Sequence, residues 1–236
     1  MTENKKIKVL TISDHPLLPS GVGTQTKNVI EALLQTGKFE VLSLGGAVRH
    51  RDYSHVSPES YEDCWKIIPI DGYGEQGMIR TIISQFKPDI LYFMTDPRFY
   101  QWLWDIEHEL RDNVPFVYYH VWDNKPYPTF NQPLYESNDM IATISKVTSD
   151  IVKNVAPNTD EQYVPHAVDT EIFKPASTNT DNEKIKEFKK NIPDCGDKLI
   201  FFWNNRNARR KQSGTLLFWW KEFLDRVGHD KAVLLM

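Results

Sequence analysis

Two cationic residues, Arg206 and Lys211, are the side chains of this sequence best suited to chemistry by type and spacing. They follow the apolar run 199–203 and precede a segment of helical periodicity at 215–227. A turn from a strand into a helix directs backbone N–H groups and cationic side chains to one place, where a phosphate group is bound most strongly. The pair therefore predicts a phosphate-binding turn. The alternative is a solvated basic turn that only caps the helix and the sheet.

A glycine-containing loop is the second candidate for phosphate contact. Gly21 and Gly23 follow the first expected strand, and their missing side chains would allow the backbone to approach a ligand closely. A tight strand-to-helix turn is the alternative explanation. The dinucleotide-binding pattern of three glycines fails because Thr26 holds its last position, so an NAD- or FAD-dependent oxidoreductase is a secondary hypothesis.

The elements that must position these residues alternate between short β-branched or aromatic runs and helical periodicity. Strands are expected at 7–13, 40–44, 66–70, 89–94, 116–121, 140–144, 162–164 and 198–203. Helices are expected near 24–35, 75–86, 98–111, 145–154 and 215–227. Such alternation predicts an α/β fold with a Rossmann-like, doubly wound parallel sheet, whose ligands bind at the carboxyl ends of the strands.

A domain boundary is expected after Pro175. The stretch 176–182 is small, polar and turn-prone, and it precedes a charged helical segment and the next strand. Residues 1–175 are therefore predicted to form one α/β domain, and residues 176–236 the beginning of a second. The second segment is expected to leave its aromatic helix face, around 216–224, without a complete set of partners.

The composition excludes several classes of function. A net charge of −4 argues against a nucleic-acid partner. Cys64 and Cys195 are isolated, which indicates neither a disulfide framework nor a zinc site, and no metal ligand set is predicted. With no apolar run of about 18 residues, the sequence is interpreted as soluble and cytoplasmic, with peripheral attachment to a membrane left open.

Three segments in order carry a resemblance to a known family: 19–25, the run Val-Pro-His-Ala-Val-Asp-Thr-Glu-Ile-Phe-Lys-Pro at 164–175, and the turn from Arg206 to Lys211. The chain resembles the GT-B glycosyltransferases of the glycogen-synthase-like group, the retaining "family 4" type. The likeness covers the whole chain but only the first half to two-thirds of such an enzyme. It implies two Rossmann-like domains, the first supplying acceptor surface and the second binding a nucleotide-sugar donor.

The resemblance also implies roles for particular residues. The donor diphosphate is expected to contact the basic pair and the glycine loop, namely Arg206, Lys211, Gly21, Val22 and Gly23. His120 matches a position near the transferred sugar, where polar contact or charge relief is expected and nucleophilic attack is not. A structural histidine is the alternative.

The acceptor or sugar side is expected to include Asp14, Asp96, Asp123 and His166. Turn formation by Asp and Pro is the favoured explanation for Asp14 and Asp96. For His166, a backbone hydrogen bond that holds the link between domains is favoured over catalysis.

The sequence departs from the family pattern where Ala167 replaces a glycine and where the loop reads Gly-Val-Gly. The paired-glutamate motif of the family is expected beyond Met236, so the chain is predicted to be incomplete as an enzyme. The predicted function is retaining glycosyl transfer from a nucleoside-diphosphate sugar to a saccharide, lipid or protein hydroxyl, without a metal or other cofactor. The alternatives are a noncatalytic sugar- or nucleotide-binding remnant and a subunit completed by a partner chain.

Overall fold

The computed structural model describes residues 5–236, which divide into two compact units. The first unit ends at Ala167 and the second runs from Val168 to Met236. The expected boundary after Pro175 lies a little way into the second unit. The difference has a local cause, because the Gln25 side chain donates to the carbonyl oxygen of Ala167 at 2.8 Å and holds the chain against the first unit up to that point.

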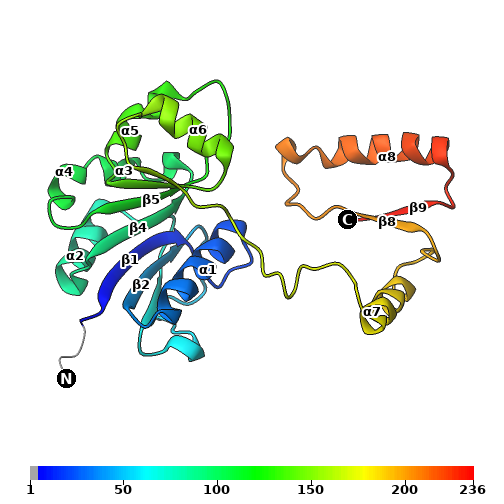
Figure 1. Cartoon of the computed structure of the whole chain (residues 1–236), viewed down its shortest axis with the longest axis horizontal. Helices are drawn as coiled ribbons and strands as arrows, with labels where there is room; N and C mark the ends of the chain where they lie inside the picture. Colours follow the sequence, from blue (N-terminus) through cyan, green and yellow to red (C-terminus); the bar gives the residue numbers. More distant parts are fainter. Residues whose placement is uncertain (1–4) are drawn as a thin grey trace. The chain divides into compact units, whose positions relative to one another are not determined.

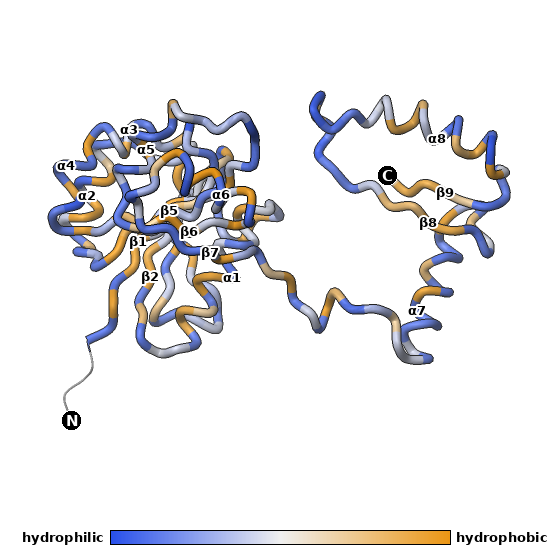
Figure 2. The backbone as a smooth tube through the Cα atoms, turned by 45° about the horizontal axis from the view of Figure 1, so that its top comes forward, coloured by the Kyte–Doolittle hydropathy of each residue, from blue (hydrophilic) through white to orange (hydrophobic). Residues whose placement is uncertain are grey.

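The first unit is built on a seven-stranded parallel sheet (Figure 1). Its strands are β1 (Ile7–Asp14), β2 (Phe39–Gly46), β3 (Trp65–Pro69), β4 (Ile90–Thr95), β5 (Phe116–His120), β6 (Met140–Thr143) and β7 (Glu161–Tyr163). They are arranged in the order β3-β2-β1-β4-β5-β6-β7. The central strands are rich in apolar residues, as Figure 2 shows, because helices pack on both faces of the parallel sheet. The predicted α/β fold with a doubly wound parallel sheet is thereby confirmed.

The two faces of the sheet are packed by different helices. One face is covered by α1 (Gly21–Gln35), which places Ile30 and Leu34 in the core. The other face is covered by α2 (Gln76–Phe86), α3 (Gln101–Trp104), α4 (Glu107–Leu110), α5 (Gln132–Glu136) and α6 (Lys146–Val155). Short 3₁₀ turns lie at η1 (Glu59–Tyr61), η2 (Pro97–Phe99) and η3 (Thr129–Asn131).

The helix expected at 98–111 is broken into η2, α3 and α4. Tyr100 and Ile106 have φ angles of −115° and −120°, outside the helical range. Both side chains are buried, and the Tyr100 hydroxyl lies 2.8 Å from the carbonyl oxygens of Ile12 and Met94. Burial of these residues therefore overrides the local helical periodicity.

The N-terminus of α1 is set by Ser20 and Gly23. The Ser20 hydroxyl caps the helix by accepting from the Gly23 amide at 2.9 Å. A Cβ atom on Gly23 would lie 2.7 Å from the carbonyl oxygen of His15, whereas a Cβ on Gly21 would meet nothing within 4 Å. Gly23 is therefore required by the packing of the turn, and Gly21 is not.

The second unit contains α7 (Asn179–Lys190), β8 (Leu199–Phe202), η4 (Arg209–Lys211), α8 (Ser213–Val227) and β9 (Ala232–Leu235). Strands β8 and β9 pair in parallel, and α8 connects them. Phe202 and Trp219 are 68% and 59% exposed, so apolar side chains of both the small sheet and α8 face solvent in the described chain. None of the helices within residues 5–236 combines the length and the apolar character needed to cross a membrane.

The contrast between Gly23 and Gly21 gives a stability prediction. Gly23→Ala is expected to lower the free energy of unfolding by about 1–3 kcal/mol, because the new methyl group overlaps the His15 carbonyl. Gly21→Ala, the matched control, is expected to change it by less than about 1 kcal/mol. Urea titrations followed by far-UV circular dichroism compare the two variants. Equal losses of stability would contradict the packing account.

Candidate functional site

The carboxyl ends of three neighbouring strands place Asp14, Asp96 and His120 at one edge of the first unit's sheet. Asp14 ends β1, Asp96 follows β4, and His120 ends β5 directly opposite Thr95. The order of the strands reverses between β1 and β4. This switch point is where open α/β sheets bind ligands. Three residues predicted separately from the sequence thus share the edge that this fold uses for binding.

The Asp14 carboxylate is held by two hydroxyl groups. Ser20 donates to one oxygen and Tyr73 to the other, each at 2.7 Å. Burial raises the pKa of Tyr73, and its hydrogen bond to Asp14 raises it further, so the phenol remains a donor. Asp14 is therefore an oriented carboxylate and not only a turn residue.

Buried tyrosines complete the hydrogen bonding where the strands end. The hydroxyl of Tyr118 donates to the Thr95 carbonyl at 2.7 Å, and the Tyr100 hydroxyl lies between the ends of β1 and β4. These carbonyl groups lie at or next to the last paired residues of β1 and β4. The two phenols thus hydrogen-bond the strand ends next to Asp14 and Asp96.

Asp96 forms a paired contact with Arg98. The Arg98 Nε and Nη2 atoms donate to the two carboxylate oxygens at 2.8 and 2.7 Å. Burial acts to raise the pKa of Asp96, but the hydrogen bonds from Arg98 outweigh it and lower that pKa. The carboxylate is therefore ionised at neutral pH, and it is already oriented by Arg98.

His120 is completely buried. Its Nε2 atom lies 2.7 Å from the Tyr135 hydroxyl, and its Nδ1 atom has no hydrogen-bond partner among the described residues. Burial lowers the pKa of His120 to about 3, although the charge of Asp96 acts in the opposite direction. The imidazole is neutral at neutral pH. Of the roles expected from the sequence, a buried neutral ring fits polar contact or a structural histidine, and it does not fit relief of charge.

Gly21, Val22 and Gly23 form the first turn of α1 and not a separate loop. The Gly23 amide is occupied by Ser20, while the amides of Gly21 and Val22 belong to positions that lack acceptors inside the helix. The exposed Gly21 leaves this turn open to a ligand. The turn follows the same strand end as Asp14.

Among the described residues, no hydrogen bond joins Asp123 or His166 to Asp14, Asp96 or His120. Asp123 is exposed in the segment after β5. His166 is exposed after β7, and its ring contacts Tyr119 edge to face with the ring centroids 5.4 Å apart. The network of Asp14, Ser20 and Tyr73 includes neither residue.

Arg206 and Lys211 belong to the second unit, in the connection from β8 to α8. Arg206 is exposed, Lys211 is partly exposed at the end of η4, and Gln212 turns the chain into α8 with a left-handed φ of 57°. Within residues 5–236, neither cation forms an ion pair with a carboxylate. Two cations without partners before a helix N-terminus can bind an anion.

Several residues of the edge were not predicted as site residues: Ser20, Tyr73, Tyr100, Asn131 and Tyr135. Ser20 alone could have been found, because a serine immediately before a helical segment is a common N-cap. The tyrosines act through contacts between distant parts of the chain. Tyr73 and Asp14, for example, are 59 residues apart.

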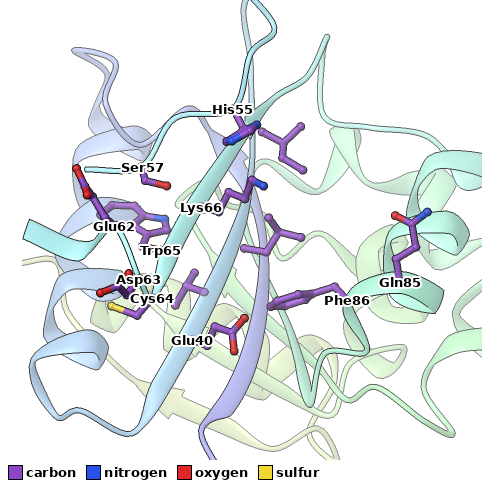
Figure 3. Close-up of a pocket in the computed structure, with 13 residues that line it drawn as sticks. Glu40, His55, Ser57, Glu62, Asp63, Cys64, Trp65, Lys66, Gln85 and Phe86 are labelled. Carbon is purple, nitrogen blue, oxygen red and sulfur yellow. The ribbon is translucent and has the colours of Figure 1, made fainter. Parts of the chain in front are cut away.

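Two further observations concern metal binding and the position of the main hollow in the first unit. Among the described residues, no group of three or more His, Cys, Asp or Glu side chains is placed to hold a metal ion. A hollow of about 510 Å³ lies elsewhere, where β2 and β3 begin, and Figure 3 shows Glu40, His55 and Lys66 around it. This hollow is at the opposite end of those strands from the edge that carries Asp14.

The low pKa of His120 predicts a pH dependence of stability. Between pH 6.5 and about 3 the unfolded chain binds a proton that the folded chain does not, so the free energy of unfolding falls as the pH falls. From pH 7 to pH 5, His120 is expected to contribute a loss of about 2 kcal/mol. The variant His120→Gln should lack this part of the pH dependence in urea titrations. His55→Gln, an exposed control, should retain it; equal pH dependence in both variants would contradict the assignment.

No protein-family model matches the sequence, and no curated protein matches it. Solved structures match its fold. A trehalose-6-phosphate protein from E. coli bound with UDP-2-fluoro glucose superposes with a TM-score of 0.60 at 13% identity, covering 96% of this chain and 63% of its own. A trehalose-6-phosphate synthase, studied for glycosyl transfer with retention, superposes with a TM-score of 0.57 at 14% identity. The match covers 96% of this chain and 62% of the synthase.

A glycosyltransferase from Rickettsia africae gives a TM-score of 0.63 at 15% identity, covering 98% of this chain and 68% of its own. The chain thus spans less than two thirds of the length of the two trehalose-6-phosphate structures. At these identities the likeness concerns the fold. The chain has the α/β, Rossmann-like fold of GT-B glycosyltransferase structures.

Proposed function

We propose that this chain takes part in glycosyl transfer from a nucleoside-diphosphate sugar to a hydroxyl acceptor, with retention of the anomeric configuration. The observation that carries the proposal is the fold likeness, which extends over 96–98% of the chain to structures of sugar-transferring proteins. One of those proteins was solved with a UDP sugar analogue. The unpaired cations after β8 and the oriented carboxylates at the sheet edge support the same class of reaction.

In the proposed reaction, Arg206 and Lys211 bind the donor diphosphate. Breaking the bond between the sugar and the phosphate leaves negative charge on the diphosphate, and fixed cations stabilise that charge in the transition state. The planar guanidinium of Arg206 suits two phosphate oxygens at once, while Lys211 supplies a point charge. The N-terminus of α8, which begins at Ser213, favours the same anion. These groups replace a divalent metal in the proposal.

The first unit is proposed to contact the sugar and the acceptor. The amides of Gly21 and Val22 can donate to donor phosphate or sugar oxygens, and His120 can donate to the transferred sugar. Asp14 and Asp96 are ready to accept hydrogen bonds from hydroxyl groups, because other side chains already orient both carboxylates. Asp123 and His166 are proposed for the outer part of the acceptor side. The free cysteines Cys64 and Cys195 suit a cytoplasmic location.

The diphosphate proposal predicts ligand-dependent stabilisation. UDP- or GDP-sugar at about 100 times its Kd is expected to raise the Tm by about 5 °C. Arg206→Ala and Lys211→Ala are each expected to weaken binding about ten-fold or more, because each removes a hydrogen bond to a charged phosphate. Arg210→Ala is the matched control, since it removes an exposed cation from the same turn, and it should retain the shift. Thermal unfolding with each nucleotide sugar measures these effects.

Two results would contradict the diphosphate proposal. One is stabilisation by NAD in place of nucleotide sugars, which would favour an oxidoreductase. The other is a loss of binding in Arg210→Ala as large as that in Lys211→Ala, which would indicate a diffuse basic surface.

Transfer itself is a separate prediction. Any release of UDP or GDP from the donor in the presence of sugar acceptors is expected to continue when EDTA is added, and NMR of the product should show the anomeric configuration of the donor. Binding without any release above background would instead support the noncatalytic alternative or a requirement for a partner chain. Loss of release on adding EDTA would contradict the proposal that no metal is needed.

A further inference from the structure

A chain of three buried polar side chains ends at the imidazole of His120. The Asn131 Nδ2 atom donates to the Tyr135 hydroxyl oxygen at 3.3 Å, and that oxygen lies 2.7 Å from His120 Nε2. Asn131 is 4% exposed, and Tyr135 and His120 are 0% exposed. These three side chains connect η3, α5 and the end of β5. The geometry of their hydrogen bonds determines which imidazole nitrogen carries the proton.

The direction of the hydrogen bonds follows from counting donors and acceptors. Because the hydroxyl oxygen of Tyr135 already accepts from Asn131, its own proton is available to His120 Nε2. Nε2 then acts as the acceptor, and the neutral ring carries its proton on Nδ1. In the reverse arrangement, Tyr135 would accept two hydrogen bonds, and its proton would need another acceptor, which the described residues do not provide.

The surroundings of the ring support a neutral imidazole. The ionisable groups that face it are Asp96 after β4, Tyr118 on β5 and Tyr135 on α5. Burial lowers the pKa of His120 to about 3, so the ring does not take a second proton at neutral pH. Burial also raises the pKa of Tyr135 to about 12, so its hydroxyl retains the proton that it donates.

We propose that Tyr135, held by Asn131, is a positioning residue that fixes His120 as its neutral Nδ1–H tautomer and keeps that N–H free to donate to a ligand. An unpartnered buried donor costs stability, and such groups are rare in folded proteins unless a ligand or water uses them. The identity of the ligand, an oxygen atom of the transferred sugar, rests on the proposed function. The assignment of the tautomer does not depend on the proposed function.

The tautomer is measured directly by NMR of the protein labelled with ¹⁵N in histidine. Long-range proton–nitrogen correlations distinguish a protonated nitrogen from an unprotonated one, and the His120 signals are identified by their absence in His120→Gln. The expected spectrum has Nδ1 protonated and Nε2 unprotonated, unchanged between pH 7.5 and pH 5.5. Protonation of Nε2 or of both nitrogens would overturn the proposal, and this test requires no ligand.

Matched variants test the role of the hydroxyl group. Tyr135→Phe is expected to shift both His120 ring nitrogen signals towards a mixture of tautomers, and Asn131→Leu to shift them less. Tyr118→Phe is the control, because its ring lies 4.9 Å from the His120 ring but its hydroxyl donates to Thr95. It should leave the signals in place. Unchanged signals in Tyr135→Phe would overturn the proposal, and if that variant does not fold, the wild-type spectrum decides alone.

The proposed contact between His120 and the sugar is tested separately by binding measurements. Tyr135→Phe is expected to weaken binding of UDP-glucose about five-fold and to leave binding of UDP unchanged, because only the sugar would accept from Nδ1–H. Equal affinities of wild type and variant for UDP-glucose would overturn the role in sugar contact, even with the predicted tautomer. Absence of binding of both UDP- and GDP-sugars to the wild type would instead contradict the proposed function.

Discussion

The reversal of strand order between β1 and β4 is the constraint on which the first unit depends. Because every strand is parallel, the reversal sends the crossover through α1 to one face of the sheet and the crossovers through α2 to α6 to the other. The carboxyl ends of β1 and β4 lie side by side at this switch point. The Tyr100 and Tyr118 hydroxyl groups contact backbone carbonyl oxygens there, and Ser20 and Tyr73 orient Asp14 at the same edge. Side-chain hydrogen bonds at the strand ends thus build the candidate site.

The described chain divides its charge in a way that suits the proposed donor. The sheet edge of the first unit carries Asp14, Asp96 and a neutral His120, the hydrogen-bonding groups that are proposed to contact sugar hydroxyl groups. The turn after β8 carries Arg206 and Lys211 without carboxylate partners, which is suitable for a diphosphate. Burial of His120 is central to this division, because a protonated imidazole would add a positive charge at the sheet edge and remove the acceptor that Tyr135 needs.

The sequence predicted the fold well and the site only in part, for physical reasons. The strands of the sheet are local apolar runs, so β1, β2 and β4 to β6 were expected within a few residues of their observed bounds. The prediction of one continuous helix at 98–111 was wrong, because burial of Tyr100 interrupts that helix. The position of Asp14, Asp96 and His120 at the sheet edge could be predicted because they lie at the ends of strands. Their partners Tyr73 and Tyr135 could not, since side-chain contacts across the fold leave no local pattern. The roles of Arg206 and Lys211 remain predictions.

The central claim is that Arg206 and Lys211 bind the diphosphate of an activated sugar. A crystal structure of this chain with a bound UDP- or GDP-sugar tests it most directly. The account predicts diphosphate oxygens within hydrogen-bonding distance of the Arg206 guanidinium and of Lys211 Nζ, near the N-terminus of α8. A nucleotide sugar bound with its diphosphate away from both side chains, while they remain in solvent, would contradict it.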